Sequence, residues 1–175
     1  MVLKNLKLYT VVISLLVLWS CGNSDEDCTK TISIPQAYFV NGQTYTREFT
    51  QEVPCDFPEP TETEIIEPPR LENFSYQILN FNYIPDTGNN TLRLQFDIQL
   101  NNNNNFDVTG IPYFTTNSDG LIVSGASYSQ TAINPCFSIN ANSNCIFSYD
   151  QEEPLDIGLA PGSIQIINVE YIVTD

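Results

Sequence analysis

Apolar and polar residues alternate along most of the chain after residue 71, and this alternation predicts β-strands. The clearest apolar stripe, with polar residues between its members, consists of Leu92, Leu94, Phe96, Ile98 and Leu100. Similar stripes begin at Phe74 and at Ile164. Both change phase once, near Ile78 and between Ile166 and Ile167, which predicts a β-bulge in each of these strands.

Shorter apolar runs and turn signals complete this pattern. The runs lie at residues 108–115, 121–128, 137–139 and 146–149, and the turn signals at residues 86–90, 117–120 and 160–162. From residue 71 onward no segment has a convincing helical period, so no helix is predicted there. About seven strands at this spacing predict an all-β fold, with an immunoglobulin-like antiparallel β-sandwich over residues 71–175.

A separate hairpin is predicted at residues 28–55. The pair Asn41-Gly42 is a strong signal for a two-residue hairpin turn, because both turn positions need a positive φ. The register set by such a turn places Cys28 opposite Cys55, which predicts a disulfide-closed β-hairpin. We expect strands of this length to fray or bulge before they reach the base of the hairpin.

The two faces of this hairpin differ in polarity, in agreement with that register. The apolar face carries Ile32, Ile34, Tyr38, Val40, Tyr45, Phe49 and Val53. The polar face carries Ser33, Thr44, Thr46, Glu48, Thr50 and Glu52. The prolines and glutamates of residues 56–70 then predict a semi-extended, solvated linker that separates the hairpin from the sandwich.

A basic start followed by an apolar run marks residues 1–20 as a secretory signal peptide. Lys4 and Lys7 precede the apolar residues 8–19, a run too short for a comfortable membrane span. The run ends in Leu18-Trp19-Ser20-Cys21-Gly22, which resembles the lipobox of bacterial lipoproteins. This resemblance implies cleavage before Cys21 and attachment of a diacylglycerol to its thiol. An uncleaved anchor helix is the alternative.

Acidic residues dominate the short segment 21–27, which we predict to be a tether. Its cluster Ser24-Asp25-Glu26-Asp27 resembles the surface-export signal of Bacteroidota lipoproteins. This resemblance implies a lipid-anchored protein on the outer face of the outer membrane. A hydrated spacer without an export role is the alternative interpretation of the same residues.

One stretch of the predicted sandwich has a family likeness. An unbroken strand ends in residues 101–105, a second strand begins at Val108, and a turn at Asp119-Gly120 leads into an apolar strand. This order resembles small immunoglobulin-like modules of the FxLYD and water-stress type, which are common in bacterial lipoproteins. The resemblance implies the fold and says nothing about activity.

Composition narrows the range of functions. Lys and Arg number 6 against 21 Asp and Glu, so the chain has a formal net charge of −15 and repels nucleic acid. The absence of histidine excludes Ser-His-Asp and Cys-His nucleophile pairs and histidine metal sites. We therefore expect no enzyme activity, and no cofactor or metal is predicted.

The cysteine count agrees with export. Five cysteines are present, an odd number that lipidation of Cys21 would explain. We expect the other four to pair in an oxidising compartment, Cys28 with Cys55 and Cys136 with Cys145. Free buried thiols or a metal site are the alternatives, although the spacings lack the close C-x-x-C pairs that are usual in four-thiolate zinc sites.

The asparagine run 101–105 is a candidate binding segment. Asparagine side chains can supply oxygen ligands, and with Asp86, Asp107 and Asp119 they could form a calcium site. No D-x-D-x-D-G loop is present, however, and asparagine is also common in polar loops because it tolerates left-handed backbone conformations. A polar strand-connecting loop is therefore the favoured interpretation.

Two further sets of side chains could carry chemistry. Asp150, Glu152 and Glu153 could act as paired glycosidase carboxylates, but adjacent acids on a loop usually face water. Exposed aromatic side chains would suit contact with carbohydrate or protein, although core positions are more common for such residues. The candidates are Tyr113, Phe114, Tyr128 and Tyr149.

These observations lead to one functional hypothesis and two alternatives. The chain is expected to be a lipid-anchored, non-catalytic surface lipoprotein that acts as an interaction or accessory module at the outer membrane, with a protein partner. The first alternative is a glycan- or calcium-binding accessory protein of a nutrient-uptake system. The second is a polymerising fibre subunit, which would need an unpaired strand edge or a donor strand.

Overall fold

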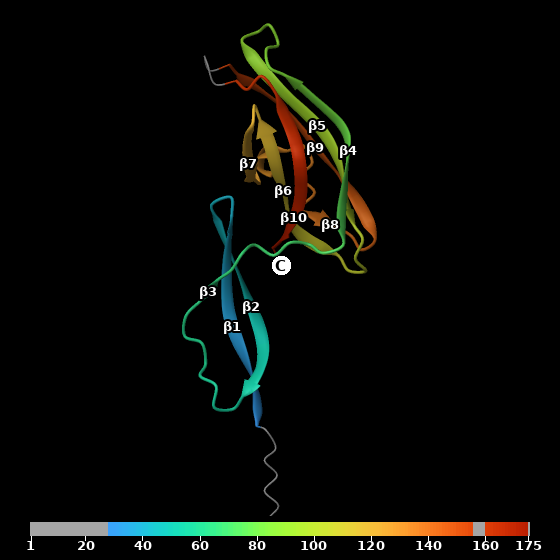
Figure 1. The fold of residues 1–175 in the computed structure, drawn as a ribbon. Coiled ribbons are helices and arrows are strands. Elements are labelled where there is room, and N and C mark those ends of the chain that lie inside the picture. The colour runs from blue at the N-terminus through green and yellow to red at the C-terminus, as the bar shows by residue number, and fades with distance from the viewer. Residues whose placement is uncertain (1–27, 156–159, 175) are drawn as a thin grey trace, which may run out of the picture. The chain divides into compact units, whose positions relative to one another are not determined.

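The computed structural model describes residues 28–155 and 160–174 (Figure 1). The predicted signal peptide, Cys21 and the export residues Ser24, Asp25, Glu26 and Asp27 lie outside the described residues. Within the described residues no helix is long and apolar enough to cross a membrane. The chain divides into two compact units, one including residues 28–33 and 50–59 and the other including residues 34–49 and 60–174.

The predicted hairpin is present, and its turn and its base follow the same register. Strand β1 (Thr29–Val40) and strand β2 (Gln43–Pro54) flank a turn in which Asn41 and Gly42 adopt φ values of 51° and 78°. At the other end the Cys28–Cys55 disulfide closes the hairpin, and the Cys55 amide donates to the Cys28 carbonyl at 2.9 Å. The pairing of Cys28 with Cys55 is thus confirmed, and the expected fraying or bulge before the base is wrong.

The distal half of the hairpin gives the same register within the second unit. Tyr38 and Tyr45 stack with ring centroids 5.5 Å apart, and Arg47 Nε donates to Gln36 Oε1 at 3.0 Å. Each of these pairs is directly opposite in the register that the Asn41-Gly42 turn sets. The stacked rings and the polar pair therefore hold the strands in this register independently of the disulfide.

A third, parallel strand joins the hairpin from within the predicted linker. Strand β3 (Glu64–Ile65) pairs with β1 at Gln36 and Ala37. Gln36 Nε2 donates to Glu64 Oε2 at 2.9 Å, and the Ile66 amide donates to the Ala37 carbonyl at 2.9 Å. The linker is therefore not solvated throughout, because part of it satisfies backbone groups on the free edge of β1.

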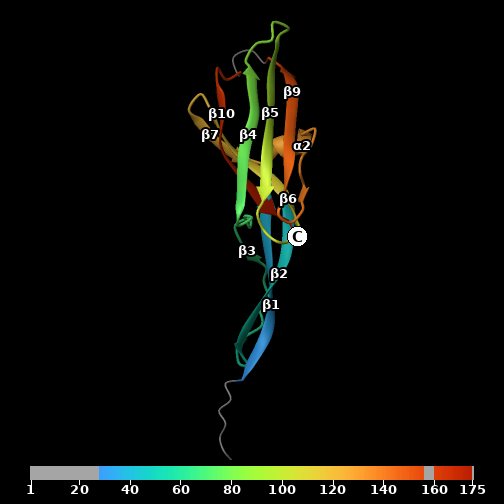
Figure 2. The same cartoon turned by 90° about the vertical axis from the view of Figure 1, so that its right-hand side faces the viewer.

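The second unit contains the predicted antiparallel β-sandwich (Figures 1 and 2). One sheet has the order β4-β5-β9, formed by β4 (Phe74–Ile84), β5 (Thr91–Asn102) and β9 (Ser143–Pro154). The other has the order β10-β6-β7, formed by β10 (Ile164–Val173), β6 (Val108–Ser118) and β7 (Leu121–Gly125). Strand β8 (Ser138–Ile139) also pairs with β6. The all-β, immunoglobulin-like fold class is confirmed.

An aromatic core lies between these two sheets. Phe96 of β5 stacks with Phe147 and Tyr149 of β9, with centroid distances of 5.9 and 5.0 Å, and contacts Phe114 of β6 at 5.8 Å. Register shifts occur between Ile78 and Asn80 of β4 and between Ile166 and Asn168 of β10, so both predicted bulges are confirmed. Each bulge returns the apolar stripe of its strand to the core face.

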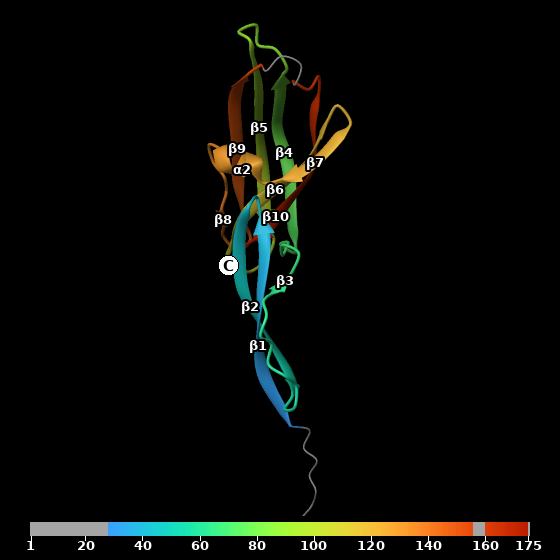
Figure 3. The ribbon, with the colours of Figure 1, turned by 90° about the vertical axis from the view of Figure 1, so that its left-hand side faces the viewer.

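The prediction that residues 71–175 contain no helix is wrong at one turn. Helix α2 (Ser127–Thr131) follows β7, where the sequence predicted that the strand would continue to residue 128 (Figure 3). Ser129 Oγ donates to the Pro112 carbonyl at 2.7 Å, and the Tyr128 ring contacts Phe96 edge-on with centroids 5.5 Å apart. A single turn carries too few residues to show a helical period, so packing determines its conformation.

The asparagine run contains a buried hydrogen-bond network. Asn102, whose exposed fraction is 1%, donates through Nδ2 to the carbonyls of Phe106, Ile139 and Asn140 at 2.8 to 3.2 Å. Its Oδ1 accepts from both the amide and the side chain of Asn104 at 3.0 Å. The run thus includes the end of β5 and a polar connection, and Asn102 holds that connection to residues 139–140.

Close packing of β6 against β10 depends on Gly110. A Cβ added at this position would lie 2.2 Å from the Ile172 carbonyl oxygen and 2.5 Å from the Tyr171 ring. The Tyr171 hydroxyl in turn donates to the Cys136 carbonyl at 3.0 Å. Cys136 forms the second predicted disulfide with Cys145, so that pairing is also confirmed.

Candidate functional site

The candidate calcium-binding carboxylates accept hydrogen bonds from backbone amides of the same chain. Asp86 Oδ1 accepts from the Gly88 amide at 2.8 Å, and Asp107 Oδ1 accepts from the Ala141 amide at 2.8 Å. Among the described residues, no group of three or more Cys, Asp or Glu side chains is placed to hold a metal ion. These carboxylates accept hydrogen bonds from loop amides, which agrees with the interpretation of these segments as polar connections between strands.

Asp119 connects the β6–β7 turn to the segment that enters β10. Its carboxylate accepts from the Gly162 amide at 2.6 Å and from the amide and hydroxyl of Ser163 at 2.8 and 2.9 Å. The hydrogen bond from Gly162, followed by those from Ser163, lowers the pKa of Asp119 from its ordinary value of 3.8, and desolvation opposes the shift. The charged carboxylate is therefore the form that holds the two segments together.

Replacement of Asp119 by asparagine should therefore change how stability depends on pH. A carboxylate with a lowered folded-state pKa stabilises the fold above its ordinary pKa, and this contribution is lost as the pH falls through the folded-state value. We expect Asp119→Asn to lower the urea midpoint at pH 7, and the difference from the wild type to shrink as the pH falls from 4 to 2. A difference that stays constant over this range would contradict the prediction.

The candidate carboxylate cluster on β9 is engaged with β5. Arg93 donates through Nε and Nη2 to the two carboxylate oxygens of Asp150 at 2.8 and 2.7 Å, which lowers the pKa of Asp150. Glu152 accepts a hydrogen bond from Thr91 Oγ1. Asp150 and Glu152 therefore stabilise the pairing of β9 with β5.

The candidate aromatic residues mainly belong to the core. Phe114 and Tyr149 are buried, and Tyr128 packs edge-on against both of them. Tyr113 is partly buried beside a small cluster that includes Tyr38, Val40 and Ile172. None of the four projects fully into solvent, so an aromatic recognition surface made of them is not present.

A surface that the sequence analysis did not single out lies on β7. The exposed fractions of Leu121, Ile122 and Val123 are 66%, 61% and 52%, although all three are large apolar residues. We call these three residues the β7 edge patch. Strand β7 ends its sheet and is paired only with β6, so one side of its backbone meets no strand in the described part of the chain.

The β7 edge patch lies within an uncharged part of an acidic protein. Residues 120–149 contain no Asp, Glu, Lys or Arg, whereas the whole chain has a net charge of −15. This uncharged stretch is visible in the sequence and could have indicated the position of the patch. Exposed apolar surface without charge is typical of the centre of protein interfaces.

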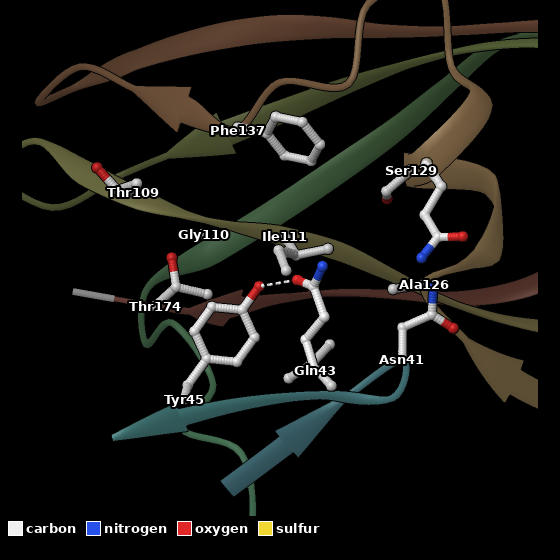
Figure 4. A pocket seen from close by; sticks show the side chains of 12 residues that line it. Asn41, Gln43, Tyr45, Thr109, Gly110, Ile111, Ala126, Ser129, Phe137 and Thr174 are labelled. Atoms are coloured by element: carbon white, nitrogen blue, oxygen red, sulfur yellow. Dashed lines mark hydrogen bonds between the residues drawn. The ribbon is translucent and has the colours of Figure 1, made fainter. Parts of the chain in front are cut away.

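A pocket of about 350 Å³ forms the second candidate site (Figure 4). Asn41, Gln43 and Tyr45 line it from the hairpin, and the sandwich contributes Thr109, Gly110, Ile111, Ala126, Ser129, Gln130, Phe137 and Thr174. The Tyr45 hydroxyl donates to Gln43 Oε1 at 2.9 Å, as the dashed line in Figure 4 marks. Amides, hydroxyls, two aromatic rings and the apolar side chains of Val40, Ile111 and Ala126 thus surround the cavity, and its lining has no charged side chain.

This lining suits a neutral ligand that has both polar groups and an apolar face. The side chains of Asn41, Gln130 and Thr174 have no hydrogen-bond partner among the described residues, so their donors and acceptors are available. The Phe137 ring is 46% exposed and offers an apolar surface beside them. The four described cationic side chains, by contrast, all have partners within the chain: Lys30 with Glu59, Arg47 with Gln36, Arg70 with Glu170, and Arg93 with Asp150.

The fold defines the chain as an all-β protein with a disulfide-closed hairpin and an immunoglobulin-like sandwich. Comparison with family models, with curated proteins and with solved structures finds no match for the chain. The functional assignment therefore rests on the residues themselves: the lipobox-like motif at Cys21, the β7 edge patch and the pocket of Figure 4.

Proposed function

We propose that this protein is a lipid-anchored, non-catalytic surface lipoprotein that acts as an interaction or accessory module at the outer membrane. The lipobox-like motif that ends at Cys21 supports the anchor, and the acidic residues 24–27 support export to the outer face. Disulfides within both the hairpin and the sandwich agree with passage through an oxidising compartment.

The β7 edge patch is the observation that supports the interaction function. A soluble sandwich usually covers or charges its edge strands, because an open apolar edge recruits other strands. Here Leu121, Ile122 and Val123 remain exposed in a chain whose acidic residues are otherwise abundant. A surface of this kind fits a protein contact better than it fits solvent.

Replacement of Cys21 by serine tests the anchor. Only a thiol can form the thioether to diacylglycerol, so Cys21→Ser should abolish palmitate labelling in the native host and release the protein from the membrane fraction. Replacement of Ser24 by alanine is a control that leaves the thiol in place and should retain the label. Label that persists in the Cys21→Ser variant would show that the lipobox interpretation is wrong.

Neutralising the acidic cluster tests surface display. We expect Asp25→Asn, Glu26→Gln and Asp27→Asn together to leave palmitate labelling intact, because Cys21 is untouched. The protein should then be retained on the inner leaflet and be protected from protease added to whole cells, whereas the wild type should be cleaved. Equal cleavage of both proteins would leave the segment as a plain spacer, and protection of both would place the protein in the periplasm.

A second candidate function is binding of a neutral glycan in the pocket of Figure 4, as an accessory to nutrient uptake. Free amides and hydroxyls beside the Phe137 ring are the chemistry that recognises sugar hydroxyls and their apolar ring faces. In affinity gels containing neutral polysaccharides, Phe137→Ala should weaken retardation roughly tenfold. Phe106→Ala is the matched control, because Phe106 is similarly exposed and does not line the pocket. Equal effects of the two changes would argue against this candidate.

A further inference from the structure

We propose that β7 is a self-pairing edge, at which two copies of this chain join in antiparallel register about Val123. The inference rests on the proposed function, since it names the partner of the β7 edge patch as a second copy of the same chain. The joint would be a closed two-fold contact in which each copy presents the same strand to the other.

Other edge strands of the described sheets carry features that discourage such pairing. Strand β2 has the charged residues Arg47, Glu48 and Glu52, and β9 has Asp150, Glu152 and Glu153. Strands β4 and β10 each contain a bulge, and the Leu71 amide donates to the Tyr171 carbonyl on β10. Strand β7 has no charge, bulge or proline, the devices by which natural proteins protect edges.

Pairing with β6 determines which backbone groups of β7 are free. Ser118 and Leu121 flank the two-residue turn at Asp119 and Gly120, whose φ values are 50° and 92°, so they form a hydrogen-bonded pair. Because antiparallel pairs alternate, Leu121, Val123 and Gly125 direct their N–H and C=O groups toward β6. Ile122 and Ser124 therefore direct theirs toward the open side of the strand.

A two-fold rotation about Val123 brings the outward-facing backbone groups of β7 opposite those of a second copy. Ile122 then lies opposite the partner's Ser124, and Ser124 lies opposite the partner's Ile122. Each of these pairs can exchange two N–H···O=C hydrogen bonds, so the free groups of both residues are satisfied on both copies. Val123 faces its own counterpart as a non-hydrogen-bonded pair, the type with the shorter Cα separation.

The side chains of β7 are also sterically compatible with this arrangement. Leu121 lies opposite the partner's Gly125, at which there is open space where a Cβ would lie. Leu121 and Val123 of the two copies therefore form one apolar cluster on a face of the joint. The uncharged residues 120–149 let two acidic chains approach here without bringing like charges together in the strands.

The size of the contact implies where it forms. Pairing of five-residue strands buries much less area than the 1,200 Å² or so of a stable dimer, so the two copies associate weakly in dilute solution. Acyl anchors would hold copies on one membrane and raise their effective concentration without any new contact. Self-pairing is therefore a property of the displayed, lipidated protein.

Single cysteines along β7 test the register. In the lipidated protein on cells treated with a mild oxidant, Val123→Cys should give at least tenfold more disulfide-linked dimer than Leu121→Cys or Ile122→Cys. Only position 123 faces its own counterpart at a Cα separation that a disulfide spans; the other two lie beyond about 7 Å from theirs. Palmitate label on the same samples reports the anchor separately.

A proline at position 124 gives the complementary test. Ser124→Pro removes an N–H that β6 does not use, so β7 should remain paired with β6 while cross-linking of the Val123→Cys protein falls at least tenfold. The thermal unfolding midpoint checks that the fold is retained. Equal cross-linking at positions 121, 122 and 123, absence of dimer while the palmitate label is present, or capture of a different polypeptide by Val123→Cys would each overturn the proposal.

Discussion

Replacement of Asn102 by alanine is expected to lower the free energy of unfolding by about 3 to 4 kcal/mol, because two buried and two partly buried polar groups lose their partner together. The carbonyls of Phe106, Ile139 and Asn140 would each lose a donor, and the Asn104 amide would lose its acceptor. An unpaired buried group costs about 1 to 3 kcal/mol, and water entering the space left by the side chain would recover part of that cost.

A neighbouring asparagine provides a matched control for this prediction. Asn105 is exposed and belongs to the same run, so Asn105→Ala should change the free energy of unfolding by no more than about 0.5 kcal/mol. Urea unfolding of the oxidised proteins measures both, with the shift read from the midpoint at an unchanged slope. Similar shifts for the two variants would mean that the run acts as an ordinary polar loop without the network described above.

Replacement of Gly110 by alanine should cost about 3 kcal/mol or more, through a steric clash rather than a lost bond. The new Cβ would meet the Ile172 carbonyl oxygen at 2.2 Å, and a backbone atom in a paired strand cannot move aside as a flexible side chain can. Relief of the clash would push β10 away from β6 and displace the Tyr171 ring from the core.

Gly125 is the control for this second prediction. It also lies in a strand of the same sheet, but there is open space where its Cβ would lie, so Gly125→Ala should be close to neutral or slightly stabilising. The two variants are compared in the same urea titration. A small effect at Gly110 would indicate that the strands separate more easily than their hydrogen bonding suggests.

Features set by local patterns were predictable from the sequence. The Asn41-Gly42 turn and the two cysteines define the hairpin register without reference to the rest of the chain. The change of phase near Ile78 likewise predicts the bulge, because a strand must keep its apolar stripe on the core side. In both cases a pattern within one hairpin or one strand determines the result.

Features set by tertiary contacts were not predictable in this way. The single turn of α2 forms because Tyr128 and Ser129 find partners in β5 and β6, which lie elsewhere in the chain. Strand β3 pairs with β1 across a sequence separation that no local pattern indicates. The pocket combines Tyr45 of the hairpin with Phe137 of the sandwich, so only the folded chain brings its lining together.

The Cys28–Cys55 disulfide also has a mechanical consequence. If Cys21 is held in a membrane, a pull on the displayed protein enters the described chain at Cys28 and passes through the sulfur atoms to Cys55. The strands β1 and β2 lie outside that covalent route, so the pairing between them is not needed to carry the load. Reduction would bring the residues between the two cysteines, separated by 27 positions, into the stretched path. The connection between the membrane and the sandwich would then lengthen under force by up to roughly 90 Å.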